Sequence, residues 1–232
     1  ILLPGLTVTI PLTAISFLFG LIIALFTALV QIAHVRVLDQ LARFYVWVIR
    51  GTPLLVQLFV IFYGLPSLGV TLDAFPSAII VFSINTGAYM AETVRGGILS
   101  IDPGQTEGAK AIGMTHVQTM INVILPQALR NIMPQIGNNL IINIKDTCVL
   151  SIIGTVELFY TTKGVAGALY TYFESFTIAM VIYFIMTFTC SRILRVIEHK
   201  MDGPDNYDLA TADTLTHTSG MYSYKERKDS RE

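Results

Sequence analysis

Long apolar stretches are the feature of this sequence that most restricts its fold. Five stretches come near the ~20 residues that an α-helix needs to cross a bilayer core. They are residues 6–30, 44–65, 75–99, 133 to about 159, and 176–197. Charged residues make up only 13% of the chain, about half of the ~25% that is usual in soluble domains. We therefore expect an all-α integral membrane protein with five transmembrane helices.

Lysine and arginine predict the orientation of these spans, because cytoplasmic loops carry an excess of both. They gather at the connections near 31–46 and 100–132 and at the end of the last span, while connections 66–74 and 160–175 hold only Lys163. We therefore place the first two connections and the C-terminus in the cytoplasm, and the N-terminus outside. Because the chain starts with isoleucine, we expect its natural start to lie further upstream.

The composition changes after the fifth span. Residues 1–200 form the predicted membrane domain, whereas residues 201–232 are polar and poor in large aliphatic side chains. Such a segment cannot bury enough apolar surface to offset the entropy of folding. We expect 201–232 to be a disordered cytoplasmic tail.

The cytoplasmic connection at about 100–132 carries the start and stop signals of a short helix. Asp102 is a good N-cap, and Pro103 suits the first helical position. Residues 105–112 can then form about two turns, with Gly113 as a natural stop. A loop of this length is usually functional or disordered, and the helix signals favour a function.

A second short helix is predicted directly after the first. Thr115 can cap residues 116–124, and we expect Pro126 to end that helix. One interpretation is a plain amphipathic helix pair at the membrane surface. The other is a docking element that enters a cleft on a partner, because the first helix presents little side-chain bulk at Gly108, Ala109 and Ala111.

Four motifs agree on one family resemblance. They are GQTEGAKAIGM followed by ILPQALRNIMPQ, YVWVIRGTPLLVQLFVIFYGLP at 45–66, NTGAYMAETVRGGI at 85–98 and NIKDTCVLSIIGTVEL at 143–158. Together they resemble the permease subunits of bacterial ATP-binding-cassette (ABC) importers, in particular the polar amino-acid branch, whose EAA loop is the first motif. The resemblance extends to about residue 200. The sequence departs from the family at Gly108, where alanine is usual, and at Cys148, where serine is common.

The resemblance implies that the 102–126 loop is the coupling element of a type I importer. Glu107 would be the acid and Gly113 the glycine of the pattern. The residues expected to contact the ATPase are Gly104, Gln105, Glu107, Gly108, Ala109, Gly113 and Met114. The chain contains no GxxxxGK[ST] phosphate loop, so we expect it not to be an enzyme and to hold no cofactor, with ATP and magnesium bound by a separate subunit.

The same resemblance implies the location and the partners of the chain. The location is the bacterial inner membrane, in contact with lipid. The expected partners are an ABC ATPase dimer, an extracytoplasmic solute-binding protein or domain, a second permease (a copy or a homologue) and an amino-acid substrate. The net charge of −1 gives no basic field for nucleic acid.

Three charged residues lie far from the ends of the predicted spans, and such residues indicate a functional site by default. They are Glu92, Lys145 and Asp146. Helical geometry places other polar residues beside them, in two stripes on neighbouring spans: Asn85, Tyr89, Glu92 and Gly96 on one, and Gln135, Asn139, Asn143 and Asp146 on the other. We expect the two stripes to face each other or a wet cavity.

A free amino acid needs an acid for its ammonium and donors for its carboxylate. Glu92 or Asp146 can take the ammonium, and Lys145, Thr147 or an amide can take the carboxylate. The substrate candidates are therefore Asn85, Tyr89, Glu92, Asn139, Asn143, Lys145, Asp146 and Thr147. The structural alternatives are that Lys145 neutralises Glu92 and that Asp146 caps a broken helix. We interpret Arg50 as an anchor at the cytoplasmic interface. Together with Gly51 and Pro53 it is expected to break its span.

Other functions stay open at this point. An ion- or proton-coupled carrier would use Glu92, Lys145 and Asp146 as a relay and would need no ATPase. A membrane scaffold with a docking loop has no use for buried polar stripes. An intramembrane enzyme would need a nucleophile or metal constellation, and none with convincing spacing is present.

Overall fold

A computed structural model describes residues 3, 5–33 and 35–202, and every structural statement below concerns those residues. The chain divides into a unit of Ile1–Leu194 and a C-terminal unit that starts at Arg195. The fold described here is that of the first unit. Residues 203–232, which make up nearly all of the predicted tail, lie outside the described residues.

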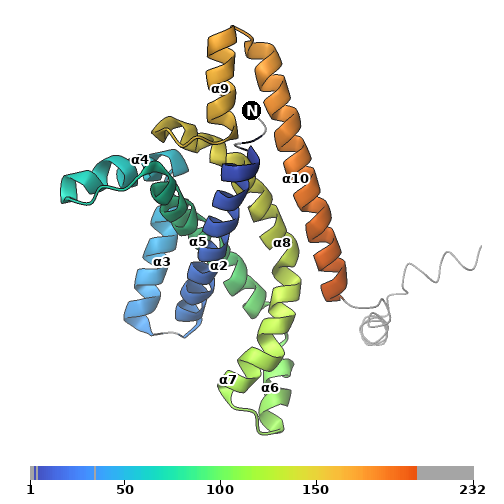
Figure 1. The fold of residues 1–232 in the computed structure, drawn as a ribbon. Coiled ribbons are helices and arrows are strands. Elements are labelled where there is room, and N and C mark those ends of the chain that lie inside the picture. Colours follow the sequence, from blue (N-terminus) through green and yellow to red (C-terminus); the bar gives the residue numbers. More distant parts are fainter. Residues whose placement is uncertain (1–2, 4, 34, 203–232) are drawn as a thin grey trace, which may run out of the picture. The chain divides into compact units, whose positions relative to one another are not determined.

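Helices make up nearly the whole of the described chain, and no strand occurs in it (Figure 1). The α-helices are α2 (Ile10–Ile32), α3 (Arg36–Arg50), α4 (Leu54–Gly64), α5 (Ala74–Leu99), α6 (Pro103–Ala111), α7 (His116–Thr119), α8 (Leu125–Asp146), α9 (Leu158–Leu169) and α10 (Tyr172–Asp202). Two π-helical segments, η1 (Gly5–Thr9) and η3 (Met120–Ile124), lead into α2 and α8. Two 3₁₀ segments, η2 (Leu65–Leu68) and η4 (Thr147–Ile153), follow α4 and α8.

Three helices are long and apolar enough to cross a membrane: α2 together with η1, α5, and α10. Two further spans result only if each of two bent helix pairs counts as one. The first pair is α3 with α4, bent by 104°, and the second is the segment from α7 to η4 with α9, bent by 55°. The all-helical membrane fold is thus confirmed, while the count of five spans stays a prediction.

The fourth predicted span differs most from the structure. Its main helix, α8, begins at Leu125 rather than near residue 133, and α9 occupies much of the expected 160–175 connection. The expectation that Pro126 ends a helix is wrong. Ile124 keeps helical backbone angles and α8 follows without a break. The π-helical segment η3 directly before the proline alters the backbone hydrogen bonding there, with the Leu125 N–H donating to the Met120 carbonyl.

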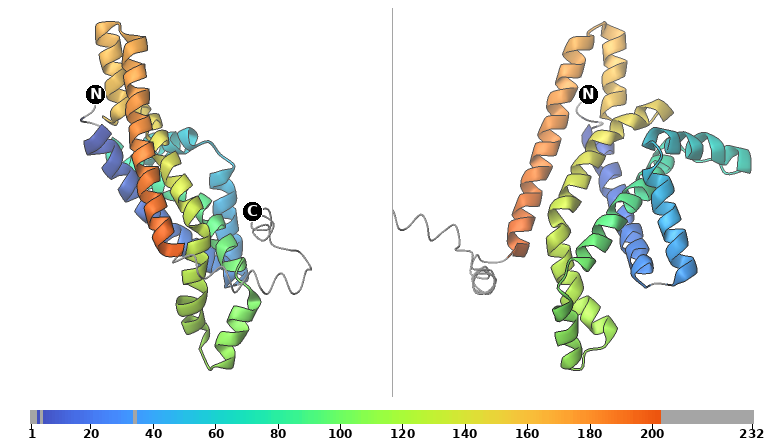
Figure 2. Two further views of the ribbon diagram at one scale, coloured as in Figure 1. Left: turned by 90° about the vertical axis from the view of Figure 1, so that its right-hand side faces the viewer. Right: turned by 180° about the vertical axis from the view of Figure 1, so that it is seen from behind.

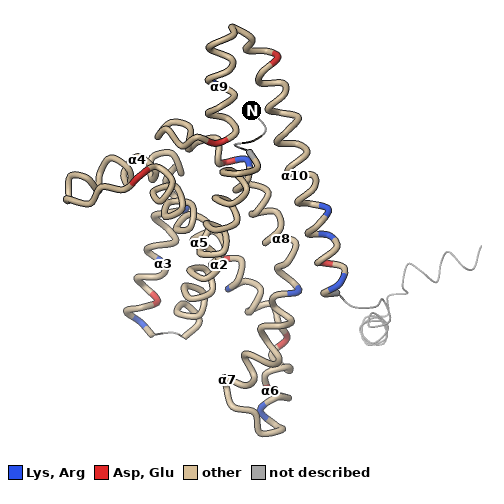
Figure 3. The backbone as a smooth tube through the Cα atoms, in the orientation of Figure 1, with Lys and Arg blue, Asp and Glu red and all other residues tan. Residues whose placement is uncertain are grey.

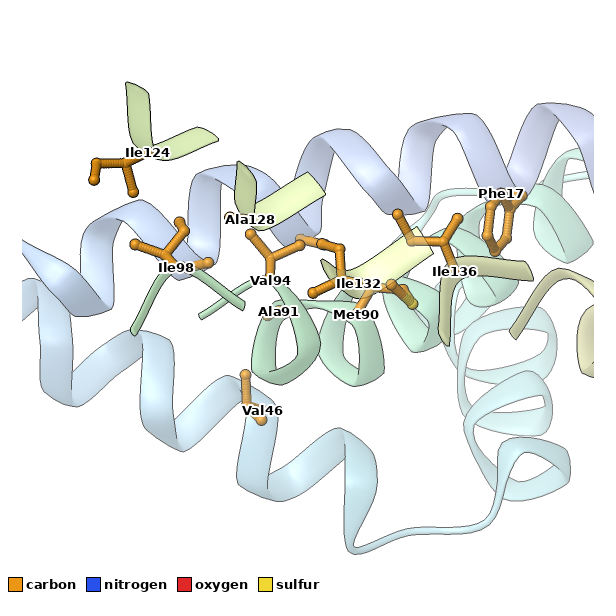
Figure 4. Packing of buried hydrophobic residues seen from close by; sticks show 12 residues of the cluster. Phe17, Val46, Met90, Ala91, Val94, Ile98, Ile124, Ala128, Ile132 and Ile136 are labelled. Carbon is orange, nitrogen blue, oxygen red and sulfur yellow. The ribbon is translucent and has the colours of Figure 1, made fainter. Parts of the chain in front are cut away.

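Helix α5 is the centre of the unit. It packs against α2, α3, α4 and α8, and Figure 4 shows Met90, Ala91 and Val94 of α5 facing Ala128 and Ile132 of α8. Glycine permits one of these close approaches. A Cβ atom on Gly97 would overlap the side chain of Ile132.

The two predicted cytoplasmic connections lie on the same side of the unit. In all three views the end of α2, the start of α3 and the α6–α7 hairpin are at one end, and the start of α2 and α9 are at the other (Figures 1 and 2). Helices α2 and α4 carry no charged residue (Figure 3). This arrangement agrees with the lysine and arginine bias, on which the assignment of that end to the cytoplasm rests.

Candidate functional site

An open cavity of about 490 Å³, most of whose lining residues are exposed at the surface, lies between α3 and α5. Helix α3 contributes residues spaced as one face of a helix, at positions i, i+3, i+4 and i+7. These are Arg43, Val46, Trp47 and Arg50, followed by Gly51 at the helix end. Helix α5 contributes Tyr89 and Glu92, three residues apart on one face of that helix. The cavity therefore combines cations, one acid and aromatic rings.

Arg50 is the last residue of α3 and is exposed. Its guanidinium carbon is 5.4 Å from the ring centre of Tyr89, which stands near the middle of α5. The predicted break at Gly51 and Pro53 is confirmed, because α3 ends at Arg50 and α4 begins at Leu54. The role of Arg50 as an anchor at the cytoplasmic interface stays a prediction.

Two ion pairs occur in the described part of the chain, and both involve residues of this cavity. Arg43 Nε donates to Asp39 Oδ1 at 2.7 Å, and Arg95 Nη2 donates to Glu92 Oε2 at 3.1 Å. Glu92 is thus paired within its own helix. The alternative that Lys145 neutralises Glu92 is wrong, since Lys145 is exposed and forms no ion pair with a described residue.

The break between α3 and α4 is held by Gln57, which the sequence did not single out. Its Nε2 donates to the carbonyl oxygens of Ile49 (2.7 Å) and Thr52 (3.0 Å). Its Oε1 accepts from Asn85 Nδ2 of α5 at 3.0 Å. The predicted site residue Asn85 therefore fixes the bent pair to α5. The motif RGTPLLVQ ends in this glutamine. A polar residue just after the predicted break was the sequence signal that could have identified Gln57.

No hydrogen bond among the described residues joins the two predicted polar stripes. Asn143 Nδ2 of α8 donates to Thr86 Oγ1 of α5 at 2.6 Å, and both side chains are buried, but Thr86 lies outside the predicted α5 stripe. Asn139 donates to the Gln135 carbonyl of its own helix at 3.1 Å. The α5 stripe instead contacts α4 through Asn85 and lines the α3–α5 cavity with Tyr89 and Glu92. Neither asparagine of α8 lines that cavity.

The remaining charged candidates stand where α8 changes into the 3₁₀ segment η4. Asp146 is half-buried, and its side chain makes no capping hydrogen bond to η4, so the predicted cap is wrong. Thr147 is fully buried and its hydroxyl donates to the Ile144 carbonyl at 2.8 Å. Neither residue lines the cavity, nor does Lys145.

A buried acid that the sequence did not indicate lies at the start of α9. Glu157 is fully buried and accepts hydrogen bonds from the backbone N–H groups of Phe159 (2.7 Å) and Tyr160 (2.6 Å). The hydroxyl of Tyr183, on α10, donates to it at 3.1 Å. Glu157 thus caps α9 and connects it to α10, which is a structural role.

The predicted coupling loop folds as a capped helical hairpin. Asp102 Oδ1 accepts from the Gly104 N–H at 2.6 Å and starts α6. Gly113 ends the helix with φ of +85°, a backbone conformation that favours glycine. Thr115 and Gln118 form a reciprocal capping box at the start of α7. The short-helix prediction is confirmed for α6.

The loop residues differ in what they can contact. Glu107, Gly108 and Gly104 are exposed and Met114 is half-buried. Ala109 is only 5% exposed, so it packs inside the hairpin and does not contribute to the small-residue surface that we expected. Gln105 accepts a hydrogen bond from Gln127 of α8 at 3.2 Å, which connects the hairpin to that helix.

Comparisons with known proteins agree with this architecture. Residues 4–203 match the family described as binding-protein-dependent transport system inner membrane component. The L-cystine transport system permease protein TcyB of Bacillus subtilis (strain 168) is 48% identical over 207 residues, 87% of each chain. The arginine transport system permease protein ArtQ of the same organism is 36% identical over 88% of this chain and 94% of its own. A crystal structure of an amino acid ABC transporter with histidines has a TM-score of 0.79 and 40% identity, covering 86% of this chain and 93% of that one.

Proposed function

The chain belongs to the family of binding-protein-dependent transport system inner membrane components, and on this premise we propose how it works as the permease subunit of an amino-acid ABC importer. It lines the translocation path, alternates access between the two sides of the membrane, and takes its driving motion from a separate ATPase subunit through the α6–α7 hairpin. This proposal assigns a mechanical role to the hairpin and a recognition role to the interior of the spans.

The observation that carries the proposal is the build of the α6–α7 hairpin. It is ordered by caps at the start of both helices. It nevertheless exposes large apolar side chains, with Ile112 79% and Val117 63% exposed. Apolar side chains on a stiff projection fit a protein partner better than water. Its hydrogen bond to α8 through Gln105 gives a direct path from that partner to the spans.

L-cystine is the first substrate to test. The relative with 48% identity is named as an L-cystine permease, whereas the one at 36% is named as an arginine permease. A complete importer further requires an ATPase dimer, a second permease and an extracytoplasmic solute-binding protein or domain. The second permease can be a copy of this chain or a homologue.

The carrier alternative has no support in the described residues. A relay through Glu92, Lys145 and Asp146 needs these groups within hydrogen-bonding reach of one another or of bridging side chains. No hydrogen bond or ion pair among described residues connects the three, and Glu92 is occupied by Arg95.

The coupling role is tested by reversing the charge of one exposed hairpin residue. We expect Glu107→Lys to lower ATP-driven uptake of L-cystine by about tenfold, because a misplaced charge at a protein interface costs on the order of 1.4 kcal/mol or more. Uptake is measured in proteoliposomes that contain the permease with its ATPase and solute-binding protein. Co-purification of the ATPase shows whether the subunits separate.

Glu174→Lys on α10 is the matched control, since it makes the same exposed charge reversal at a residue far along the chain from the hairpin. We expect the control to keep wild-type uptake. Wild-type uptake and co-purification in Glu107→Lys would contradict the coupling role. Uptake that follows an ion gradient without ATP would contradict the importer mechanism itself.

A further inference from the structure

We propose that Gln31, in the last turn of α2, controls the balance between two conformations of the transport cycle. Its side-chain amide has no hydrogen-bond partner in this structure and gains one in the alternate conformation. The inference rests on the proposed function, because a transporter that alternates access exchanges at least two packings of the same spans. It adds to that function a residue that favours the exchange.

Gln31 is a buried amide without a partner. The residue is only 2% exposed, and neither its Nε2 nor its Oε1 forms a hydrogen bond with a described residue. Among the described residues it is the one buried side chain with two such atoms, since the others without a partner are hydroxyls. Buried polar groups are nearly always hydrogen-bonded, because an unpaired one has lost its bonds to water without replacement.

The position of Gln31 in the contact between α2 and α5 explains its burial. Five buried residues of α2 recur at intervals of three or four positions, which places them on one face of the helix: Ser16, Gly20, Ala24, Thr27 and Gln31. A Cβ atom on Gly20 would overlap the side chain of Thr86, so this face is pressed against α5. Gln31 is the one long side chain on a face of otherwise small residues.

The surroundings of Gln31 are apolar. Ala28, one turn before it, belongs to a cluster that also contains Ile98 of α5 and Ile124 of η3, and Ile32 packs against the same cluster. Figure 4 shows Ile98 and Ile124 at one end of this cluster. An apolar side chain would fill the position of Gln31 without an unpaired amide. A polar residue at such a helix contact selects one packing over another at the expense of stability.

The same cluster includes the segment through which we propose that the ATPase acts. Ile124 is the last residue of η3, the π-helical segment that connects α7 to α8, and Met120 and Val123 of η3 pack against the cluster too. A displacement of the α6–α7 hairpin and α8 therefore changes what surrounds Gln31. Hydrogen bonds of amide side chains stabilise contacts between membrane helices, so a packing that supplies a partner for Gln31 gains stability relative to this one.

Thermal unfolding of the purified permease–ATPase complex in two states tests the inference. One state is nucleotide-free and the other is trapped with ATP and vanadate. Gln31→Met keeps nearly the same length and volume but removes the amide. We expect it to raise the unfolding temperature by about 3 °C in the state that leaves the amide unpaired, and to lower it by a similar amount in the other state.

Gln40→Met on α3 is the matched control, because it makes the same change at an exposed position. We expect no shift of the unfolding temperature in either state. Uptake gives a second measurement, in proteoliposomes that also contain the solute-binding protein. Gln31→Met should lower ATP-driven uptake of L-cystine about tenfold while the ATPase still co-purifies, because a change of ~1.4 kcal/mol between two states alters their populations tenfold.

Two outcomes would overturn the inference while leaving the proposed function intact. One is that Gln31→Met shifts the unfolding temperature equally in both states, since an amide that binds an internal water or stays unpaired throughout the cycle contributes equally to both. The other is wild-type uptake in Gln31→Met. Absence of ATP-driven uptake in the wild-type complex would instead contradict the proposed function.

Discussion

Helices α5 and α10 are both apolar enough to cross a membrane, yet they relate to the rest of the unit in opposite ways. In the most apolar 18-residue segment of each, 56% of α5 is buried and only 6% of α10. Helix α5 fits its neighbours through small residues and carries two residues of the cavity. Along the part of α10 in the first unit, large side chains such as Phe184 (64% exposed) and Met180 (65% exposed) are mostly uncovered, and the Phe184 ring stacks on Phe188 of its own helix.

The difference shows that length and hydropathy identify a span but do not say what the span contacts. Between apolar helices in lipid the hydrophobic effect supplies little, so close packing and polar contacts decide which helices associate. Helix α5 has both kinds of contact on several sides. Helix α10 has the Tyr183–Glu157 hydrogen bond, a ring contact of Phe176 with Phe159 of α9, and a few small buried residues near its start, Ser175 and Ala179. The following predictions test this contrast.

The largest effect is expected at the close approach of α5 to α8. Gly97→Leu should destabilise the unit by about 3 kcal/mol, because the new side chain overlaps Ile132 in a packed contact. Gly96→Leu is the matched control, since nothing lies within 4 Å of a Cβ atom at that position. Thermal unfolding in detergent, followed by circular dichroism, measures both. Equal destabilisation would mean that α5 is not held by this contact.

A smaller effect is expected at the polar contact that holds α10. Tyr183→Phe removes one of three hydrogen bonds to the buried Glu157 carboxylate and should cost about 2 kcal/mol. Tyr172→Phe removes a hydroxyl from the exposed start of the same helix and should be neutral. Faster hydrogen exchange of the backbone amides at the start of α9 would show that the Glu157 cap of this helix has loosened. Unchanged exchange in Tyr183→Phe would show that α10 is held by other contacts.

A still smaller effect is expected where α5 and α8 share a hydrogen bond. Asn143→Ala should cost about 1 kcal/mol, in the range of hydrogen bonds between membrane helices, because it leaves Thr86 without its partner. Asn139→Ala, in the same helix, removes only a bond to the helix's own backbone. The same unfolding measurement compares the two. A larger loss in Asn139→Ala would reverse the assignment of the contact face.

Periodicity and end signals made much of this architecture predictable. The third span, expected at 75–99, is α5 (Ala74–Leu99), because polar residues, Asp73 and Ser100, bound this mainly apolar stretch at both ends. The α6 helix was predictable from Asp102, Pro103 and Gly113, since each acts through local backbone geometry. Tyr89 and Glu92 were identified by their shared helix face, and they do line one cavity.

The other half of the cavity could not be assigned from sequence, because it depends on how α3 packs against α5. The positions of Gly51 and Pro53 predict a break but not its 104° angle, and the packing of α3 against α5, which brings Arg50 beside Tyr89, is a tertiary contact. Glu157 was missed for a similar reason. Its donors are two backbone groups next to it and a tyrosine on another helix, and only the tertiary fold brings that tyrosine close. The spacing of Arg43, Val46, Trp47 and Arg50 was the signal that could have revealed the cavity.

The smallest effect is expected on the exposed face of α10. Phe184→Ala should change the stability of the single subunit by less than about 0.5 kcal/mol, because a side chain that faces lipid or detergent loses little packing when it is shortened. Phe82→Ala, at a position on α5 that is 1% exposed, should cost about 3 kcal/mol by leaving a cavity. Unfolding of both variants at low protein concentration measures the difference. If Phe184→Ala destabilised the subunit as much as Phe82→Ala, α10 would have a partner within the same chain, and the contrast between the two helices would not hold.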